Sequence, residues 1–256
     1  MLAEEEFGGS LRFLVDSAKD WKRQLYKEKV LFRSIFSERT RTVLESRCFS
    51  GNRLLSLIDL ADRMIGLEND YRLNERAKES VSGTPGIEVL DSSLLDYDPQ
   101  LHRGFPERYD AVLLMDNQLA QHANQDNLDK IFQKAHELLL PGGQAIISLF
   151  NYNKVLKQEY YDFSKVPFIY KGDKYYMTRH MKVFDEDILK YLVDIYDIGG
   201  HHVKSFNELH LILTKKRLCD RLISHGFIIH ALYGDPEMSE FDVDRSSKMI
   251  VVAKKK

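Results

Sequence analysis

The chain has 256 residues, of which 43% are hydrophobic and 30% charged, and its formal net charge is −2. This composition allows one good core, or a core with a small appended lobe, and indicates neither a nucleic-acid face nor a membrane patch. Because no apolar run approaches the roughly 20 residues that span a bilayer, and because Met1 to Glu6 is acidic, unlike a signal peptide, we expect a cytoplasmic protein.

In the first half of the chain, the hydrophobic pattern changes from a helical period to an alternation of strands and helices. Residues 1–40 carry apolar side chains at helical intervals between Leu11 and Phe36, which predicts a cap of one or two amphipathic helices. From 41 to 150, short apolar runs alternate with helical stretches, which is typical of a doubly wound α/β sheet. The expected strands are Thr42–Ser46, Met64–Glu68, Ile87–Leu90, Asp110–Met115 and Gln144–Phe150, and the expected helices are Asn52–Leu60, Tyr71–Val81 and Asp126–Leu139.

The second half contains an interruption of this pattern. Residues 151–207 are rich in Tyr, Phe, Lys and His and lack a helical period, which predicts an inserted, strand-rich lid. The α/β pattern returns over 208–256, with a helix at Thr214–His225 and two closely spaced strands. These two strands favour an antiparallel hairpin at the edge of the sheet.

The turn after the first strand, "VLESRCFSGN", lies where an open parallel sheet binds ligands. Strand order usually reverses at the first strand, and ligands settle beyond the carboxyl ends of the strands at that point. Glu68 closes the second strand, where a carboxylate commonly holds a ribose hydroxyl. The sequence therefore predicts a nucleotide-like ligand at this edge.

These motifs resemble the class I S-adenosylmethionine-dependent methyltransferases. In the first motif of that family, Glu45 and Gly51 match, whereas Arg47 and Phe49 replace two glycines. "YDAVLLMDNQLAQH", "LLLPGG" and the closing "ISHGFIIHALYGD" and "KMIVVAKK" continue the resemblance, and the tail is most similar to small-molecule N-methyltransferases of the glycine and sarcosine type. The resemblance implies a seven-stranded Rossmann-like sheet with an antiparallel C-terminal hairpin, with S-adenosylmethionine as cofactor.

The resemblance also implies a set of site residues. Asp91 or Ser93 would face adenine, and Asp116 and Asn117 would hold an amine of the cofactor or substrate, unless they only cap the loop. His122 is the candidate base, with Asn117 as the second catalytic residue. The implied cofactor-binding residues are Glu45, Arg47, Cys48, Gly51, Glu68, Asp91, Ser93 and Asp116.

Two replacements in the turn leave alternatives open. Arg47 either pairs with the cofactor carboxylate or blocks the site, and Phe49 requires the loop to follow a different path. The lid aromatics form either the core of the lid or a cage around an amine or the sulfonium. These aromatics are Tyr160, Tyr161, Phe163, Tyr170, Tyr175 and Tyr176.

Metal binding is not expected. Cys48 and Cys219 lie far apart without a CxxC motif, so neither a disulfide framework nor a zinc site is predicted. The lid histidines are not spaced as a metal pair; they are His180, His201, His202 and His210.

Two functions fit the sequence. The first is methyl transfer from S-adenosylmethionine to nitrogen or oxygen of a small molecule by in-line displacement, with the acceptor read by the lid and by the helix around Trp21 and Tyr26. The second is a non-catalytic methyltransferase-like binding module whose cofactor turn has decayed. An RNA or protein substrate is disfavoured because a basic face is missing, and the oligomeric state stays open.

Overall fold

The computed structural model describes residues 10–36, 40–121 and 125–256. Within these described ranges, two helices precede the first strand, α2 (Leu11–Ala18) and α3 (Trp21–Ile35), in agreement with the helical periodicity. Each begins at a side-chain cap, because Ser10 accepts from the Phe13 amide and Asp20 accepts from the Arg23 amide. Among the described residues, no helix has the length and apolarity needed to cross a membrane.

The main sheet has seven strands in the order β10-β11-β5-β4-β1-β2-β3. β1 pairs in parallel with both β2 and β4, so the strand order reverses at β1 as predicted. β11 is antiparallel to both β5 and β10, which confirms the C-terminal hairpin. The bounds are β1 Thr42–Glu45, β2 Arg63–Leu67, β3 Ile87–Leu90, β4 Tyr109–Leu114, β5 Leu139–Phe150, β10 Phe227–Tyr233 and β11 Lys248–Lys255.

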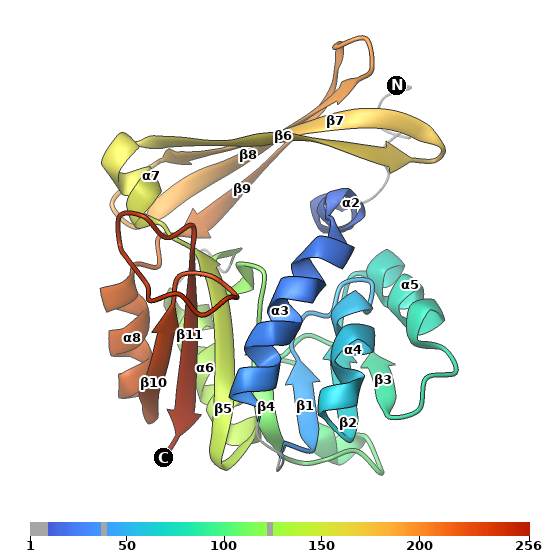
Figure 1. The fold of residues 1–256 in the computed structure, drawn as a ribbon, viewed down its shortest axis with the longest axis vertical. Coiled ribbons are helices and arrows are strands. Elements are labelled where there is room, and N and C mark those ends of the chain that lie inside the picture. The colour runs from blue at the N-terminus through green and yellow to red at the C-terminus, as the bar shows by residue number, and fades with distance from the viewer. Residues whose placement is uncertain (1–9, 37–39, 122–124) are drawn as a thin grey trace.

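Helices cover both faces of this sheet (Figure 1). On one face α3, α4 and α5 pack over a core that contains Val43; on the other, α6 and α8 pack over a core that contains Leu44. Neighbouring residues of one strand thus enter opposite cores, as expected of a parallel strand buried on both sides. The remaining bounds are α4 Asn52–Leu57, η1 Ile58–Leu60, α5 Tyr71–Val81, η2 Pro99–Leu101, η3 Gln118–Gln121, α6 Gln125–Leu138 and α8 Lys215–Ser224.

The segment around Pro141 differs from the prediction. β5 begins at Leu139, five residues before the expected start at Gln144, because Leu139 already pairs with Tyr109 before the register shifts. Residues 140–143 bulge out at this shift. A Cβ on Gly143 would lie 2.9 Å from the carbonyl oxygen of Leu140, so the bulge requires glycine there.

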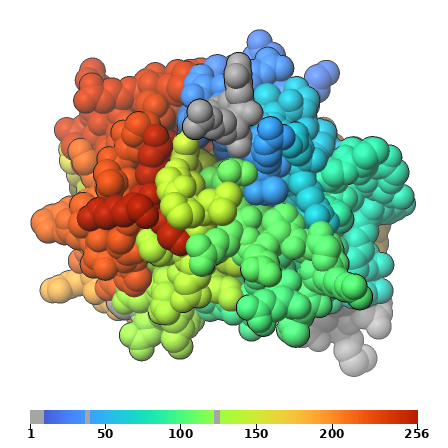
Figure 2. Space-filling model, turned by 90° about the horizontal axis from the view of Figure 1, so that it is seen from below, coloured from blue at the N-terminus to red at the C-terminus, as the bar shows by residue number. Residues whose placement is uncertain are grey.

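The inserted segment forms a second, four-stranded antiparallel sheet in the order β6-β7-β8-β9. It follows helix α7 (Asn153–Gln158), and its last strand runs to Leu211, four residues past the predicted end of the lid. The sheet lies across the carboxyl ends of β1, β4 and β5, above α2 (Figure 1). At the end of the main sheet far from the second sheet, the start of β5 and the end of β11 lie side by side (Figure 2, viewed from below). The strands are β6 Tyr160–Tyr170, β7 Asp173–Val183, β8 Ile188–Asp197 and β9 His202–Leu211.

Candidate functional site

The turn after β1 is fixed to the neighbouring strands by its backbone. The Ser46 amide donates to the Leu113 carbonyl at 3.0 Å, and the Cys48 amide donates to the Leu67 carbonyl at 3.0 Å. Phe49, which replaces a glycine of the family motif, has the left-handed φ of 51° that favours glycine. Its ring packs against Trp21, with 6.2 Å between the centroids.

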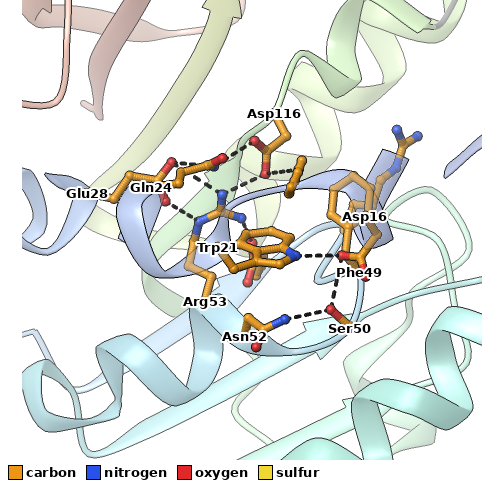
Figure 3. Close-up of polar contacts among 12 residues, drawn as sticks. Asp16, Trp21, Gln24, Glu28, Phe49, Ser50, Asn52, Arg53 and Asp116 are labelled. Carbon is orange, nitrogen blue, oxygen red and sulfur yellow. Dashed lines mark hydrogen bonds and ion pairs between the residues drawn. The ribbon is translucent and has the colours of Figure 1, made fainter. Parts of the chain in front are cut away.

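A buried arginine joins the turn to its surroundings (Figure 3). Arg53 of α4 is fully buried and donates to Glu28 at 2.8 Å, to Asp116 at 2.6 Å, and to Glu45. Burial raises the pKa of Glu45 to about 7, although Arg53 opposes the shift. The Glu45 carboxylate contacts the guanidinium of Arg53 and lines neither of the two cavities described below.

The N-terminal helices are held on the turn by a second polar contact (Figure 3). Asp16 of α2 is buried and accepts from the Trp21 indole at 3.1 Å and from the Ser50 hydroxyl at 3.0 Å. The side-chain amide of Asn52 donates to the Ser50 hydroxyl at 2.8 Å through its Nδ2. The helical cap is thus part of the site.

A first cavity of about 80 Å³, here called the strand-end cavity, lies beyond the ends of β1, β2 and β4. Its carboxylate is Glu68, which accepts from the Phe49 amide at 3.2 Å, the Asp70 amide at 2.9 Å and the Arg12 guanidinium at 3.1 Å. Burial raises the pKa of Glu68, and Arg12 offsets part of that rise. The lining residues are Ser46, Arg47, Glu68, Asn69, Ser93, Leu94, Leu95, Leu114, Gln118, Leu119 and Ile131.

Gln118 gives this cavity an unused donor. Its side-chain oxygen accepts from the Ser46 hydroxyl at 2.5 Å, while its Nε2 is buried and has no hydrogen-bond partner among the described residues. A buried amide without a hydrogen-bond partner lowers the stability of the fold by about 1–3 kcal/mol, unless a ligand accepts its hydrogen bond. The strand-end cavity therefore combines apolar walls, a carboxylate and a free donor, and this combination fits a nucleoside.

A second cavity of about 280 Å³, here called the central cavity, lies between the strand ends and the second sheet. Two contacts mark the border between the cavities: Arg47 donates to Gln121, and Arg12 to Glu68. The residues lining the central cavity are Leu11, Arg12, Val15, Lys19, Gln24, Phe49, Asp116, Asn117, Gln121, Ser148, Leu149, Phe150, Phe163, Arg179, Met181, Tyr191, Glu208, His210 and Lys248.

Asp116 and Asn117 form the floor of the central cavity in consecutive left-handed conformations, with φ of 57° and 65°. Asp116 accepts from Gln24 at 3.0 Å and lies 3.2 Å from the ammonium of Lys19. Burial by itself raises the pKa of Asp116, but Arg53 and Lys19 outweigh it and hold the pKa below its usual range.

Asn117 links the floor to the start of the insertion. Its side-chain oxygen accepts from the Phe150 amide at 3.0 Å and from the Tyr152 hydroxyl at 2.9 Å. Both lone pairs of that oxygen are therefore used, and only the amide nitrogen is left to meet a ligand.

The structure separates the predicted site residues into groups. Arg47, Glu68 and Ser93 line the strand-end cavity, and Asp116 and Asn117 line the central cavity. The predicted residues that line neither cavity are Glu45, Cys48, Gly51 and Asp91.

Each of these four residues has a different setting. Cys48 is fully buried against Gly66, where a Cβ would lie 2.7 Å from its sulfur. Gly51 begins α4 with a φ of 78° and packs against α5. Asp91 is exposed, and Glu45 pairs with Arg53. The candidate base His122 lies outside the described residues.

The sequence missed several residues that line the cavities. Gln118 lies directly after the predicted pair Asp116 and Asn117, and it could have been found by extending that motif by one residue. The others come from distant segments with no shared motif: Arg12, Lys19, Arg179, Glu208, His210 and Lys248.

The lid aromatics are divided between two roles. Phe163 lines the central cavity and packs at 5.3 Å from Phe150, whereas Tyr160 lies on the other face and stacks on His180 at 5.7 Å. Tyr170 and Tyr175 are buried in the core. Among the described residues, no group of three His, Cys, Asp or Glu side chains has a metal-binding arrangement.

No protein-family model matches the sequence, and no curated protein matches it in sequence. The fold is similar to several solved structures. The CcbJ methyltransferase from Streptomyces caelestis matches with a TM-score of 0.72 and 19% identity, over 90% of this chain and 94% of that one. CalS10 from Micromonospora echinaspora, an amino pentose methyltransferase solved with S-adenosylmethionine bound, has a TM-score of 0.66 and 13% identity, over 93% and 92%.

The sugar N-methyltransferase KedS8 from a Streptoalloteichus species matches with a TM-score of 0.67 and 17% identity, over 95% of this chain and 93% of that one. Each similarity extends over nearly the whole of both chains. The chain therefore has the fold of these S-adenosylmethionine-dependent methyltransferases, as its motifs predict.

Proposed function

We propose that the protein transfers a methyl group from S-adenosylmethionine to a nitrogen or oxygen atom of a small molecule. The observation that carries this proposal is the strand-end cavity, where Glu68 and the unpaired amide of Gln118 meet between apolar walls. A ribose supplies hydroxyl donors for the carboxylate, and a purine supplies an acceptor for the amide. The fold shared with methyltransferases supports the same function.

The residues of both cavities would hold the cofactor. In this proposal, Ser93 and Gln118 would contact the adenine, and Glu68 would contact the ribose. In the central cavity, Lys19 suits the carboxylate of the methionine part and Asp116 suits its ammonium. When bound, the cofactor supplies a methyl group on a positively charged sulfur, which is already activated for displacement.

The protein's own part in the reaction is to place the acceptor in line with that methyl group and to keep water out. Asn117, with its free amide nitrogen, lies at the floor where the acceptor would be oriented. An amine must arrive neutral and must lose a proton on methylation. Among the described residues we propose Glu208 and His210 as the acceptors of that proton, because both line the central cavity, with 3.2 Å between the His210 Nε2 and a Glu208 oxygen.

Calorimetric titration with S-adenosylmethionine and with S-adenosylhomocysteine tests the proposal. We expect micromolar binding by the wild type, and a loss of tenfold to a hundredfold in Glu68→Gln, because charged hydrogen bonds of about 1.5–3 kcal/mol are lost. Gln118→Ala should lose about tenfold. Glu75→Gln, an exposed carboxylate on α5, is the matched control and should bind as the wild type does.

The alternative is a non-catalytic binding module with a closed cofactor turn. Two contacts favour it, because Arg47 and Arg12 already engage Gln121 and Glu68 across the border of the cavities. Absence of heat with both ligands at millimolar concentration, together with unchanged emission from Trp21, the single tryptophan, would reject methyl transfer in favour of this alternative.

A further inference from the structure

The central cavity continues into a third one. This outer cavity, of about 450 Å³, lies between α3, the second sheet and the loop before β11. The two cavities share five lining residues, here called the junction: Val15, Lys19, Gln24, Arg179 and Lys248. Three of these five side chains are cations, so a molecule that passes from the outer to the central cavity meets positive charge.

Two of the three junction cations form no salt bridge with a carboxylate among the described residues. Lys19 pairs with Asp116, but neither Arg179 nor Lys248 lies within ion-pair distance of an acid there. Arg179 extends from the inner face of β7, with its guanidinium carbon 5.1 Å from the centroid of the Phe163 ring. Its Nε is buried and has no hydrogen-bond partner among those residues. Its guanidinium opposes the rise that burial causes in the pKa of Tyr191.

The carboxylates of the central cavity leave Arg179 without a salt bridge, whereas the charge of Lys248 helps to lower the pKa of Asp116. Asp116 is already bound by Arg53 and Lys19, and Glu208 lies 3.2 Å from His210. A half-buried cation without a salt bridge loses part of its hydration, and a contact with an aromatic ring replaces only part of that loss. An oxyanion at the junction would replace that hydration, and the planar fork of an arginine suits a carboxylate or a phosphate.

We infer that the methyl acceptor carries an oxyanion, and that Arg179 and Lys248 hold it at the junction while the nucleophile enters the central cavity. The inference rests on the proposed function, because it identifies the anion as part of the acceptor. The acceptor is then an amine or alcohol that also bears a carboxylate or phosphate group. Lys19, next to the turn, is left for the cofactor.

Titration with acetate and, separately, with inorganic phosphate at constant ionic strength tests this site. We expect saturable millimolar binding that persists when S-adenosylhomocysteine saturates the protein. Arg179→Gln should weaken it at least tenfold and Lys248→Gln severalfold. The preferred probe distinguishes a carboxylate from a phosphate acceptor. Arg23→Gln removes an exposed cation that lines only the outer cavity, and it should change the affinity less than twofold.

Three results would overturn the inference. They are the absence of saturable binding at high millimolar concentration, equal affinity in Arg179→Gln, and displacement of the anion by S-adenosylhomocysteine, which would assign the site to the cofactor. If Arg179→Gln does not fold, Arg179→Lys keeps the charge and should retain part of the affinity. Failure of the proposed function is recognised separately, because it removes binding of S-adenosylhomocysteine from the wild type.

Discussion

The strand-end cavity and the central cavity share a border but are assembled differently. Every residue that lines the strand-end cavity lies between Ser46 and Ile131, within consecutive β-α units of the main sheet. The central cavity takes residues from Leu11 to Lys248 and needs the N-terminal helices, the second sheet and β11. The first cavity thus follows from the topology of the sheet, whereas the second depends on how distant segments pack upon it.

The two cavities also differ in charge. The strand-end cavity has apolar walls, one carboxylate (Glu68), one cation (Arg47) and one neutral amide without a partner among the described residues. The central cavity contains several cations and two carboxylates, and Arg179 and Lys248 are left unpaired among the described residues. This difference suits a division in which the sheet binds the part of the cofactor common to such enzymes and the packed segments select the acceptor.

The largest effect is expected from the buried Arg53, which binds Asp116 in the floor of the central cavity and Glu45 next to the turn that borders the strand-end cavity. Arg53→Met leaves Glu28, Glu45 and Asp116 without their guanidinium and should lower the free energy of unfolding by about 3–5 kcal/mol. Urea unfolding followed by Trp21 emission measures the change. The control is Arg33→Met, which removes the exposed salt bridge between Arg33 of α3 and Asp59. It should lower the free energy of unfolding by at most about 1 kcal/mol.

A loss as small as that of the control would mean that the two cavities do not depend on a common support. In that case the charge cluster of Figure 3 would be dispensable for the fold. The cavities would then be independent in stability as well as in composition.

Glu45 provides a pH-dependent test of the side of the turn that faces away from the cavities. Its pKa is raised from 4.5 to about 7 in the folded chain, so the protonated form stabilises the fold. This contribution is complete below pH 4.5 and is lost as the pH rises through about 7. Relative to Glu45→Gln, the wild type should therefore lose up to about 3 kcal/mol of unfolding free energy between pH 5 and pH 8.

Urea unfolding at both pH values measures this difference, with Glu75→Gln as a control that should show none. The same Glu45→Gln variant should bind S-adenosylhomocysteine within twofold of the wild type, since Glu45 lines neither cavity. A large loss of affinity would instead restore Glu45 to the cofactor-binding set that the sequence motif implies.

The smallest effect is expected at the border of the two cavities. Arg47→Ala removes the contact with Gln121 and enlarges the strand-end cavity, so binding of S-adenosylhomocysteine should tighten about threefold to tenfold. Calorimetry measures the change, and Arg72→Ala, an exposed residue of α5, serves as the control. Weaker binding would show that Arg47 pairs with the cofactor, which is the other alternative that the sequence leaves open.

Much of the fold could be predicted because the signals are local. The apolar runs and helical periods identify the strands and helices of the main sheet, and the helix Tyr71–Val81 agrees at both ends. The order of β-α units then brings Glu68, Ser93 and Asp116 to one edge. The start of β5 was missed because a bulge, and not the apolar run, sets the pairing of Leu139 with Tyr109.

By itself, the sequence determined the α/β architecture, the hairpin, the strand-rich insertion and the edge where the site lies, since each depends on residues close together in the chain. Only the tertiary structure decided which side chains meet there. It directed Glu45 to Arg53, left Gln118 without a partner, and brought Arg179 and Lys248 to one junction. Arg179 and Lys248 lie many residues apart, and even Glu45 and Arg53 belong to different elements, so these contacts arise only when the elements pack and local patterns carry no information about them.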